Sequence, residues 1–449
     1  MGRLRLKVVK SPMIRELVGL VPRPTRHFVP VASHFLRESG VATMLANRRT
    51  FLAAGLGMGL LTNLENTLTA YDQTVGFDPT NLTKANVPTP ALLVDLDLFE
   101  SNVQKMAEHC RRSNRGFRPH AKTHKCPEIA KRQMAAGALG ICAATVPEAE
   151  ALVAAGITGV LLTSPIVEPA KIARMVSLIQ RGTGVMLSVG HPREVELLSA
   201  AATTAGINVD VLVDVDIGDR RTGILPGQPA VELAQFIAKH KRLHIRGVQS
   251  YAGHASHVVG FEARDKVSRE AMGKSVESRD LLNKAGFDAG ILSGGSTGTY
   301  NIDSTIQGVT ELQVGSYVFM DIDYRRIGGQ SSGENYSDFQ HSLTVLATVV
   351  NATHADRVSV DAGTKALDTT TTHKPEAKGW PGLTYNRGGD EFGILTLEPG
   401  AKLPQIGDRI EFIVPHCDPN VNLYDRIYAT RGDKVEAIWP IAARRESRA

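Results

Sequence analysis

Seven residues near the start of the main body of the chain, Pro119–Lys125, carry two lysines and two histidines in the order PHAKTHK. They follow Arg115–Arg118, a short run that is typical of the end of a strand. Neighbouring positive charges lower the pKa of a lysine, and a neutral amine can form a Schiff base with an aldehyde. We therefore predict that Lys122 is a reactive amine; a solvated basic loop is the alternative.

A second stretch, Ser293–Thr299, has the sequence SGGSTGT. Its glycines would let backbone N–H groups approach an anion, and its hydroxyl groups add hydrogen-bond donors. A flexible turn can have the same composition. A reactive lysine together with an anion-binding loop indicates pyridoxal 5'-phosphate. A nicotinamide cofactor would require a GxGxxG turn early in the chain, and the sequence has none there.

A third feature, His416-Cys417-Asp418, follows a predicted strand. On an extended chain, residues i and i+2 point to the same side, so His416 and Asp418 could share one divalent ion while Cys417 faces away. Imidazole and carboxylate suit manganese, magnesium or cobalt better than a thiolate-rich site would. In isolation, such a pair is usually a coincidence of the surface.

The elements that must position these residues alternate regularly. A buried strand at 91–96 and a helix at 98–112 come first. Short apolar runs then alternate with amphipathic stretches, which predicts eight strands separated by helices. The predicted strands are residues 117–121, 140–144, 159–163, 185–189, 209–213, 245–250, 290–293 and 311–314. This pattern favours an α/β fold of the (β/α)8 barrel type, with an open doubly wound sheet as the alternative.

Polar residues collect just after these strands, which is where a (β/α)8 barrel places its active site. Lys122 follows the first predicted strand. The other polar runs after strands are Asp214–Gly223, Tyr251–His254, Ser293–Thr299 and Gly315–Tyr317. The strand ends therefore predict that these separate motifs form one site.

The chain of 449 residues is long enough for more than one domain. We predict the barrel over residues 86–325. Residues 326–445 have a different pattern, in which strand-like runs are separated by polar and Gly/Pro-rich loops. They predict a mainly β second domain that carries His416 and Asp418. Residues 1–75 are predicted to be a leader outside the fold.

The leader contains Arg48-Arg49-Thr50-Phe51-Leu52 followed by a weakly apolar Gly/Ala-rich run. This order resembles a twin-arginine (Tat) export signal, which predicts a Tat translocon as partner and a periplasmic location; without a functional leader the location would be cytoplasmic. The apolar run of about 11 residues is too short for a membrane span, which needs about 20. A helix capped by arginines is the alternative, and residues 1–43 are consistent with an upstream extension that is not translated.

The net charge of +5 is unevenly distributed. Residues 1–70 contain ten Lys/Arg and three acids, so the rest of the chain is slightly negative, which argues against nucleic-acid binding by the body. The four cysteines are scattered and form no CxxC, which argues against a zinc knuckle or a disulfide framework.

Several of these motifs together resemble one family. Arg118–Lys125 resembles the cofactor-lysine motif of the D-threonine aldolase and D-serine dehydratase family, which are fold-type III pyridoxal-phosphate enzymes related to alanine racemase. Asp216–Gly223 is similar to the alanine racemase segment whose arginine contacts the phenolic oxygen of the cofactor. The resemblance extends over residues 87–440. It implies a barrel followed by a β domain, and a homodimer.

The resemblance also implies roles for individual residues. Lys122 would hold the cofactor and act in catalysis. Further cofactor contacts are implied for Arg221, Tyr251, Gly294, Gly295, Ser296, Thr297 and Tyr317. We predict His254 as a catalytic residue, and His257 is a second candidate for the same base.

The residue two places after His416 bears on the reaction. D-threonine aldolases carry His-Cys-Asp, as this chain does, whereas D-serine dehydratases tend to carry cysteine at the third position and bind zinc. The resemblance therefore implies retro-aldol cleavage of a D-3-hydroxy amino acid to glycine and an aldehyde. We expect manganese as the metal, with magnesium, cobalt and zinc as alternatives. The alternative functions are a D-serine or 3-hydroxyaspartate dehydratase, an amino-acid racemase and a non-catalytic pyridoxal-phosphate carrier.

Overall fold

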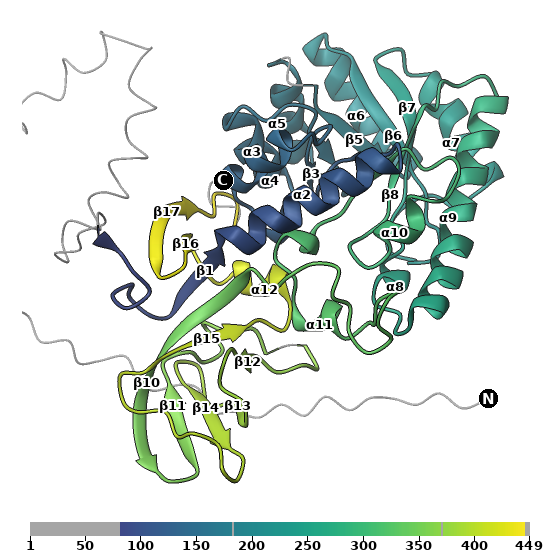
Figure 1. Cartoon of the computed structure of the whole chain (residues 1–449). Helices are drawn as coiled ribbons and strands as arrows, with labels where there is room; N and C mark the ends of the chain where they lie inside the picture. The colour runs from purple at the N-terminus through teal and green to yellow at the C-terminus, as the bar shows by residue number, and fades with distance from the viewer. Residues whose placement is uncertain (1–80, 182–183, 370, 445–449) are drawn as a thin grey trace, which may run out of the picture. The chain divides into compact units, whose positions relative to one another are not determined.

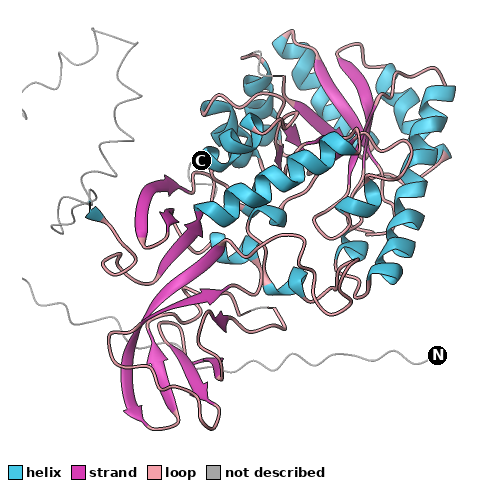
Figure 2. Cartoon of the chain, in the orientation of Figure 1, coloured by secondary structure: helices cyan, strands magenta, loops and turns pink. Residues whose placement is uncertain are grey.

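The computed structural model describes residues 81–181, 184–369 and 371–444, and the leader motif at Arg48 and Arg49 lies outside these residues. Within them, strands form two sheets, one parallel and surrounded by helices and one mainly antiparallel (Figures 1 and 2). Both sheets contribute to one continuous hydrophobic core. None of the described helices is both long and apolar enough to cross a membrane.

Eight parallel strands form the first sheet in the order β2-β9-β8-β7-β6-β5-β4-β3. They are β2 (Gly116–Phe117), β3 (Cys142–Ala143), β4 (Leu161–Leu162), β5 (Met186–Val189), β6 (Val209–Asp214), β7 (Leu243–Gln249), β8 (Ile291–Gly294) and β9 (Glu311–Leu312). A parallel bridge between His120 and Cys142 joins the two ends of this order and closes the barrel. The predicted (β/α)8 barrel is therefore confirmed, and all eight strands lie within or overlap the predicted runs.

Helices connect these strands and surround the sheet (Figure 2). They are α2 (Leu96–Arg112), α3 (Pro127–Ala135), α4 (Val146–Ala154), α5 (Pro169–Ile179), α6 (Pro192–Ala205), α7 (Gln228–Ala238), α8 (Gly253–Ser256), α9 (Phe261–Lys284), α10 (Tyr300–Asp303) and α11 (Ile322–Arg325). Proline stands in the first turn of α3 to α7, where its missing N–H costs no hydrogen bond. Helices α4 and α6 begin within a few residues of the preceding strand, whereas residues 215–227 form a longer loop between β6 and α7.

The barrel interior contains a buried ion pair at the strand that precedes Lys122. Arg118 Nε lies 2.8 Å from Glu311 Oε1, and both side chains are almost fully buried. The guanidinium of Arg118 also donates to the carbonyl oxygen of Gly159. The pair connects strands β2 and β9 across their junction and anchors the segment that leads to Lys122.

The second sheet has the order β13-β14-β11-β10-β1-β16-β17, with β15 paired to β10 and to β12. Its strands are β1 (Ala91–Asp95), β10 (Leu343–His354), β11 (Arg357–Val360), β12 (Glu376–Ala377), β13 (Leu383–Arg387), β14 (Gly393–Leu397), β15 (Arg409–Ile413), β16 (Arg426–Arg431) and β17 (Lys434–Pro440). The mainly β second region is confirmed. Strand β1, which precedes the barrel in sequence, lies between β10 and β16, so the sheets do not divide the chain at a single point.

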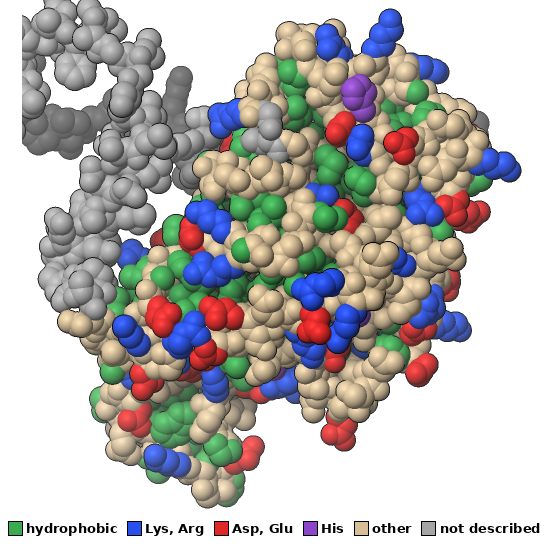
Figure 3. Space-filling model, turned by 45° about the horizontal axis from the view of Figure 1, so that its top comes forward, with side chains coloured by type: hydrophobic (Ala, Val, Ile, Leu, Met, Phe, Trp, Pro, Cys, Tyr) green, Lys and Arg blue, Asp and Glu red, His purple; other side chains and the backbone are tan. Residues whose placement is uncertain are grey.

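Figure 3 shows lysine and arginine side chains interspersed with aspartate and glutamate over the visible face of the described residues. A mixed surface of this kind agrees with the slightly negative charge of the body.

Candidate active site

Lys122 lies on a short 3-10 turn (Ala121–Thr123) directly after strand β2. Its Nζ is 2.5 Å from Oδ2 of Asp418, a residue that follows strand β15 of the second sheet. Burial lowers the pKa of Lys122, but the carboxylate of Asp418 outweighs burial and holds the pKa above its ordinary value. The structure therefore differs from our expectation of a lowered pKa, because the nearest charge is an acid.

The other basic residues of PHAKTHK do not surround Lys122 with positive charge. Burial lowers the pKa of His120 to about 3 and that of His124 to about 4, so both rings are neutral near pH 7. Lys125 is paired with Glu148 at 2.8 Å. His120 instead holds the backbone of this segment in place. Its ring accepts from the backbone N–H of Lys122 and contacts the hydroxyl of Thr163 at 3.1 Å.

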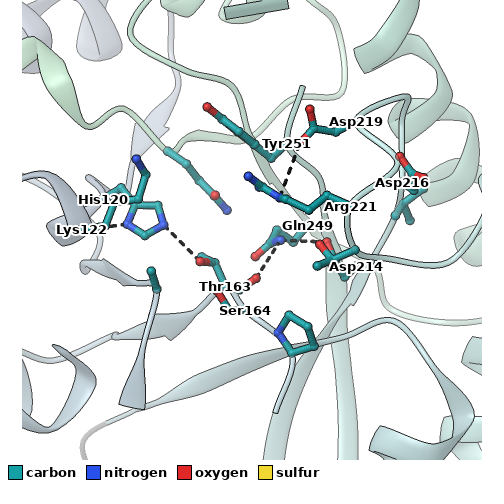
Figure 4. Close-up of a pocket in the computed structure, with 15 residues that line it drawn as sticks. His120, Lys122, Thr163, Ser164, Asp214, Asp216, Asp219, Arg221, Gln249 and Tyr251 are labelled. Atoms are coloured by element: carbon teal, nitrogen blue, oxygen red, sulfur yellow. Dashed lines mark hydrogen bonds and ion pairs between the residues drawn. The ribbon is translucent and has the colours of Figure 1, made fainter. Parts of the chain in front are cut away.

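A cavity of about 550 Å³ opens beside Lys122 at the carboxyl ends of the barrel strands (Figure 4). It is lined by His120, Lys122, Ala144, Thr163, Ser164, Pro165, Asp214, Val215, Asp216, Asp219, Arg221, Thr222, Gln249, Tyr251 and Gln313. An amine that opens into a cavity with a guanidinium and an aromatic ring fits an aldehyde cofactor with an aromatic ring.

Arg221 and Tyr251 form one wall of this cavity (Figure 4). The guanidinium carbon of Arg221 lies 5.3 Å from the centre of the Tyr251 ring, within cation–π distance. Nε of Arg221 is also 3.5 Å from Asp219. Lys122, Arg221 and Tyr251, which were predicted from three separate motifs, are thus brought to one cavity.

The Ser293–Thr299 loop does not line this cavity directly. Its hydroxyl groups are used within the protein: Ser296 Oγ contacts Thr299 Oγ1 at 3.1 Å, and Thr297 Oγ1 accepts from the backbone N–H of Tyr317. A Cβ at Gly294 would approach the carbonyl oxygen of Ser250 to 2.6 Å, and one at Gly295 would approach Asp303 to 2.7 Å. The glycines thus permit close packing against neighbouring segments.

Tyr317 lies in the core. Its hydroxyl accepts from Gln133 Nε2 at 3.2 Å, and its ring packs against Phe339. The side chain therefore does not reach the cavity, although its backbone supports the Ser293–Thr299 loop.

His416 and Asp418 lie side by side, with Nε2 3.7 Å from Oδ2. The extended conformation that we predicted there is wrong: His416 is the N-cap of a short helix, α12 (Cys417–Val421), and the start of the helix brings the two side chains together. Cys417 is buried and faces away, as predicted. Its Sγ donates to the carbonyl oxygen of Met320 at 3.5 Å, which turns the thiol away from His416 and Asp418. Burial and nearby acids hold the pKa of this thiol well above the ordinary value.

The surroundings of this pair fit a divalent ion. Oδ1 of Asp418 is buried and forms no hydrogen bond of good geometry with any described residue. Nδ1 of His416 lies 3.0 Å from the buried carboxylate of Asp321, which leaves Nε2 to face Asp418. Among the residues that the structure describes, no group of three or more His, Cys, Asp or Glu side chains has the arrangement of a metal site, so His416 and Asp418 stand as a pair of candidate ligands.

The two candidate histidines are separated by the structure. His254 lies against the turn after strand β6, where its backbone N–H donates to Asp219 and its ring borders Gly218. His257 stacks on Tyr324 with ring centres 4.3 Å apart. Tyr324 belongs to the helix that Asp321 caps, so His257 lies on the side of the cavity where His416 is held. Burial lowers the pKa of His257.

Our sequence reasoning missed Asp321 and Thr163. Asp321 ends the stretch Gly315–Asp321 and is the N-cap of α11, where its Oδ1 accepts from the N–H of Tyr324 at 2.9 Å. An aspartate one place before a helix is a capping signal that could have been noticed. Thr163 is a polar residue at the end of a predicted strand. The expectation that polar residues at strand ends form the site therefore applies to Thr163 as well.

A closed parallel barrel with a lysine at a strand end, joined to a mainly β region that supplies an imidazole and a carboxylate, is the arrangement of fold-type III pyridoxal-phosphate enzymes. Residues 94–323 match the family described as "Alanine racemase, N-terminal domain", and residues 342–430 match "Putative serine dehydratase domain". The chain belongs to the D-threonine aldolase and D-serine dehydratase-like family of these enzymes.

Individual relatives cover most of the chain. The D-threonine aldolase of Arthrobacter sp is 39% identical over 364 residues, which span 81% of this chain and 94% of the relative. The 3-hydroxy-D-aspartate aldolase of Paracoccus denitrificans (strain Pd 1222) is 33% identical over 387 residues, spanning 85% and 99%. The crystal structure of D-threonine aldolase from Filomicrobium marinum superposes with a TM-score of 0.77 at 38% identity, covering 81% of this chain and 98% of that one.

Proposed function

We propose that this chain uses pyridoxal phosphate and a divalent metal to cleave D-3-hydroxy amino acids of the D-threonine type to glycine and an aldehyde. The observation that carries the proposal is the contact of 2.5 Å between Lys122 and Asp418, with His416 beside them. This contact places the amine of Lys122 beside the two candidate metal ligands, His416 and Asp418, and next to the cavity. When bound, pyridoxal phosphate accepts the electron pair of the broken Cα–Cβ bond, and the metal lowers the pKa of the β-hydroxyl group.

The chain's own residues bind and orient in this proposal. Lys122 supplies the amine that holds the cofactor. Arg221 and Tyr251 border the space for its ring, because both line the cavity. The backbone of the Ser293–Thr299 loop is the proposed phosphate site.

His257 is the proposed base that takes the proton from the β-hydroxyl group. It lies within electrostatic reach of His416 and Lys122, and burial keeps its ring neutral and able to accept a proton. His254, our first candidate from the sequence, lies against the Asp219 turn. We therefore assign His254 a supporting role for the cavity wall.

Manganese is the metal that we propose for His416 and Asp418. One imidazole and one carboxylate, with the neighbouring thiol turned towards the carbonyl oxygen of Met320, are suitable ligands for a hard or intermediate ion. Magnesium, cobalt and zinc are the alternatives to be compared in the assay below.

A product assay tests the proposed function. The purified chain with pyridoxal phosphate and Mn²⁺ is given D-threonine, with and without EDTA. We expect acetaldehyde and glycine in equal amounts, and no product after EDTA treatment. L-threonine is the control substrate and should give no product.

The second candidate is a dehydratase, which the match of residues 342–430 to a putative serine dehydratase domain favours. A dehydratase would release ammonia and 2-oxobutanoate from D-threonine in the same assay. That outcome would contradict the aldolase proposal while leaving the roles of Lys122 and the metal pair in place.

We also propose that the chain forms a homodimer and is exported through the Tat translocon to the periplasm. Light scattering of the purified protein checks the dimer, and a monomer mass would contradict it. A folded reporter fused to residues 44–75 should reach the periplasm and should stay in the cytoplasm when Arg48 and Arg49 are both changed to Lys. Unchanged localisation of that variant would contradict the export proposal.

A further inference from the structure

Arg264 on helix α9 is a fully buried arginine that the proposed reaction does not use. Its guanidinium donates to four backbone carbonyl oxygens, at distances of 2.7 to 2.9 Å, and these belong to Val258, Gly298, Ile327 and Gly328. No carboxylate lies within ion-pair distance of it among residues 81–181, 184–369 and 371–444. A buried cation held only by carbonyl oxygens keeps its positive charge available to act on its surroundings.

The four carbonyl oxygens belong to three segments that meet around Arg264. Val258 follows His257 directly, Gly298 belongs to the Ser293–Thr299 loop, and residues 327 and 328 follow α11. Arg264 therefore joins the loop of the proposed base to the loop of the proposed phosphate site.

Tyr336 contacts the same loop from the same side as Arg264. Its buried hydroxyl donates to the carbonyl oxygen of Thr297 at 2.5 Å, and its ring lies 5.7 Å from the guanidinium carbon of Arg264. Two adjacent carbonyl oxygens of the loop, those of Thr297 and Gly298, are thus held by buried donors.

These contacts fix the direction of the loop's N–H groups. In a trans peptide, the C=O of one residue and the N–H of the next point in opposite directions. Because Tyr336 holds the carbonyl oxygen of Thr297, the N–H of Gly298 points away from Tyr336. The carbonyl oxygen of Ser296 accepts from the N–H of Thr299, so the N–H of Thr297 points away from Thr299.

The N–H groups of Thr297 and Gly298 have no acceptor among the described residues, although both residues are buried. Unpaired N–H groups in a protein interior are rare. Of the loop's hydroxyl groups, that of Thr299 is committed, because its Oγ1 donates to the buried carboxylate of Asp303 at 2.5 Å. The hydroxyl oxygen of Thr297 accepts from the N–H of Tyr317, which leaves its proton free to donate. The backbone N–H groups of Thr297 and Gly298 are therefore two donors that the loop can offer to an anion.

We propose that Arg264 and Tyr336 are positioning residues, which hold the carbonyl oxygens of Gly298 and Thr297 so that the N–H groups of this loop bind the phosphate of the cofactor. Arg264 also supplies a buried positive charge behind that phosphate. This inference rests on the proposed function, since it takes pyridoxal phosphate as the ligand.

The test compares two ligands that differ only in the phosphate. Binding of pyridoxal phosphate and of pyridoxal is followed by the change in absorbance when the amine of Lys122 captures the aldehyde. Two variants are tested. Tyr336→Phe removes one hydroxyl and keeps the ring, and Arg264→Lys keeps the positive charge but loses the planar guanidinium that donates to four carbonyl oxygens. Arg269→Met is the matched control, since Arg269 lies on the same helix and is exposed and paired with Asp265.

We expect Tyr336→Phe to raise the dissociation constant for pyridoxal phosphate by about 5-fold, as for the loss of one hydrogen bond, and Arg264→Lys to raise it by about 10-fold or more. Affinity for pyridoxal should stay within about 2-fold in both variants. Arg269→Met should bind both ligands as the parent protein does.

Two results would overturn the inference. If both ligands weaken equally in Tyr336→Phe, the residue has a general structural role only. If Tyr336→Phe folds with an unchanged melting temperature and binds pyridoxal phosphate normally, the hydroxyl does not orient the loop. Failure of the parent protein to capture either ligand would instead contradict the proposed function itself.

Discussion

The buried carboxylate of Asp321 receives three contacts from two parts of the chain. It lies 3.0 Å from His416 Nδ1, accepts from the N–H of Cys417 at 3.0 Å and caps α11 through Tyr324. A carboxylate on one ring nitrogen fixes the orientation of the imidazole and makes the other nitrogen a better ligand. Single residues outside the metal pair therefore determine how well the pair can bind an ion.

Changing Asp321→Asn should weaken Mn²⁺ binding by about 10- to 100-fold, because the His416 ring loses the charged partner that orients it. Titration of free Mn²⁺ by electron paramagnetic resonance measures the affinity without any turnover. Asp323→Asn, on the same short helix, is the control. An equal loss in both variants would contradict the specific role of Asp321.

The two histidines after strand β7 give a second prediction at this scale. His257→Ala should lower kcat for D-threonine cleavage by about 100-fold or more, as expected for loss of a general base. His254→Ala should change kcat by less than about 10-fold. Both variants are compared at equal cofactor content, measured by absorbance, and the reverse order of effects would show that His254 is the base.

At the scale of the elements, the barrel strands and their polar ends were predictable because each signal is local. A buried strand is read from a short apolar run, and the parallel arrangement then brings Lys122, Arg221 and Tyr251 together. The conformation of His416–Asp418 was not predictable in this way. An extended segment and a helix start can both place residues i and i+2 together, and only packing distinguishes them.

The ion pair between Arg118 and Glu311 gives a prediction for the barrel. Arg118→Met should reduce the free energy of unfolding by about 3–5 kcal/mol, because it leaves the Glu311 carboxylate buried without its partner. Urea unfolding measures the change. Arg112→Met is the control, since Arg112 forms an exposed pair with Glu108 and should cost less than about 1 kcal/mol. A similar small loss in both would contradict a structural role for the buried pair.

At the scale of the whole molecule, the active site depends on both sheets. Lys122 comes from the barrel, and its partner Asp418 comes from a segment 296 residues later in the chain. The place of β1 in the second sheet could not be predicted from sequence, because strand pairing over such distances leaves no local signal. The leader and the oligomer remain predictions.

Metal binding should therefore stabilise the whole protein. At about 100 times its dissociation constant, Mn²⁺ should add about 2.7 kcal/mol to the free energy of unfolding. The melting temperature should rise with Mn²⁺ and return to its starting value with EDTA. Asp418→Asn should abolish the rise, and a rise that persists in this variant would place the metal elsewhere.

The position of β1 also has a consequence for synthesis on the ribosome. Leu93 pairs with Tyr428, so the strand that leaves the ribosome first waits for one of the last strands before its second edge is covered. Until then that edge can pair with a strand of another nascent chain. A chain that ends before His416 would lack both β16 and the metal-binding pair, so such incomplete products would be prone to aggregation and inactive at the same time.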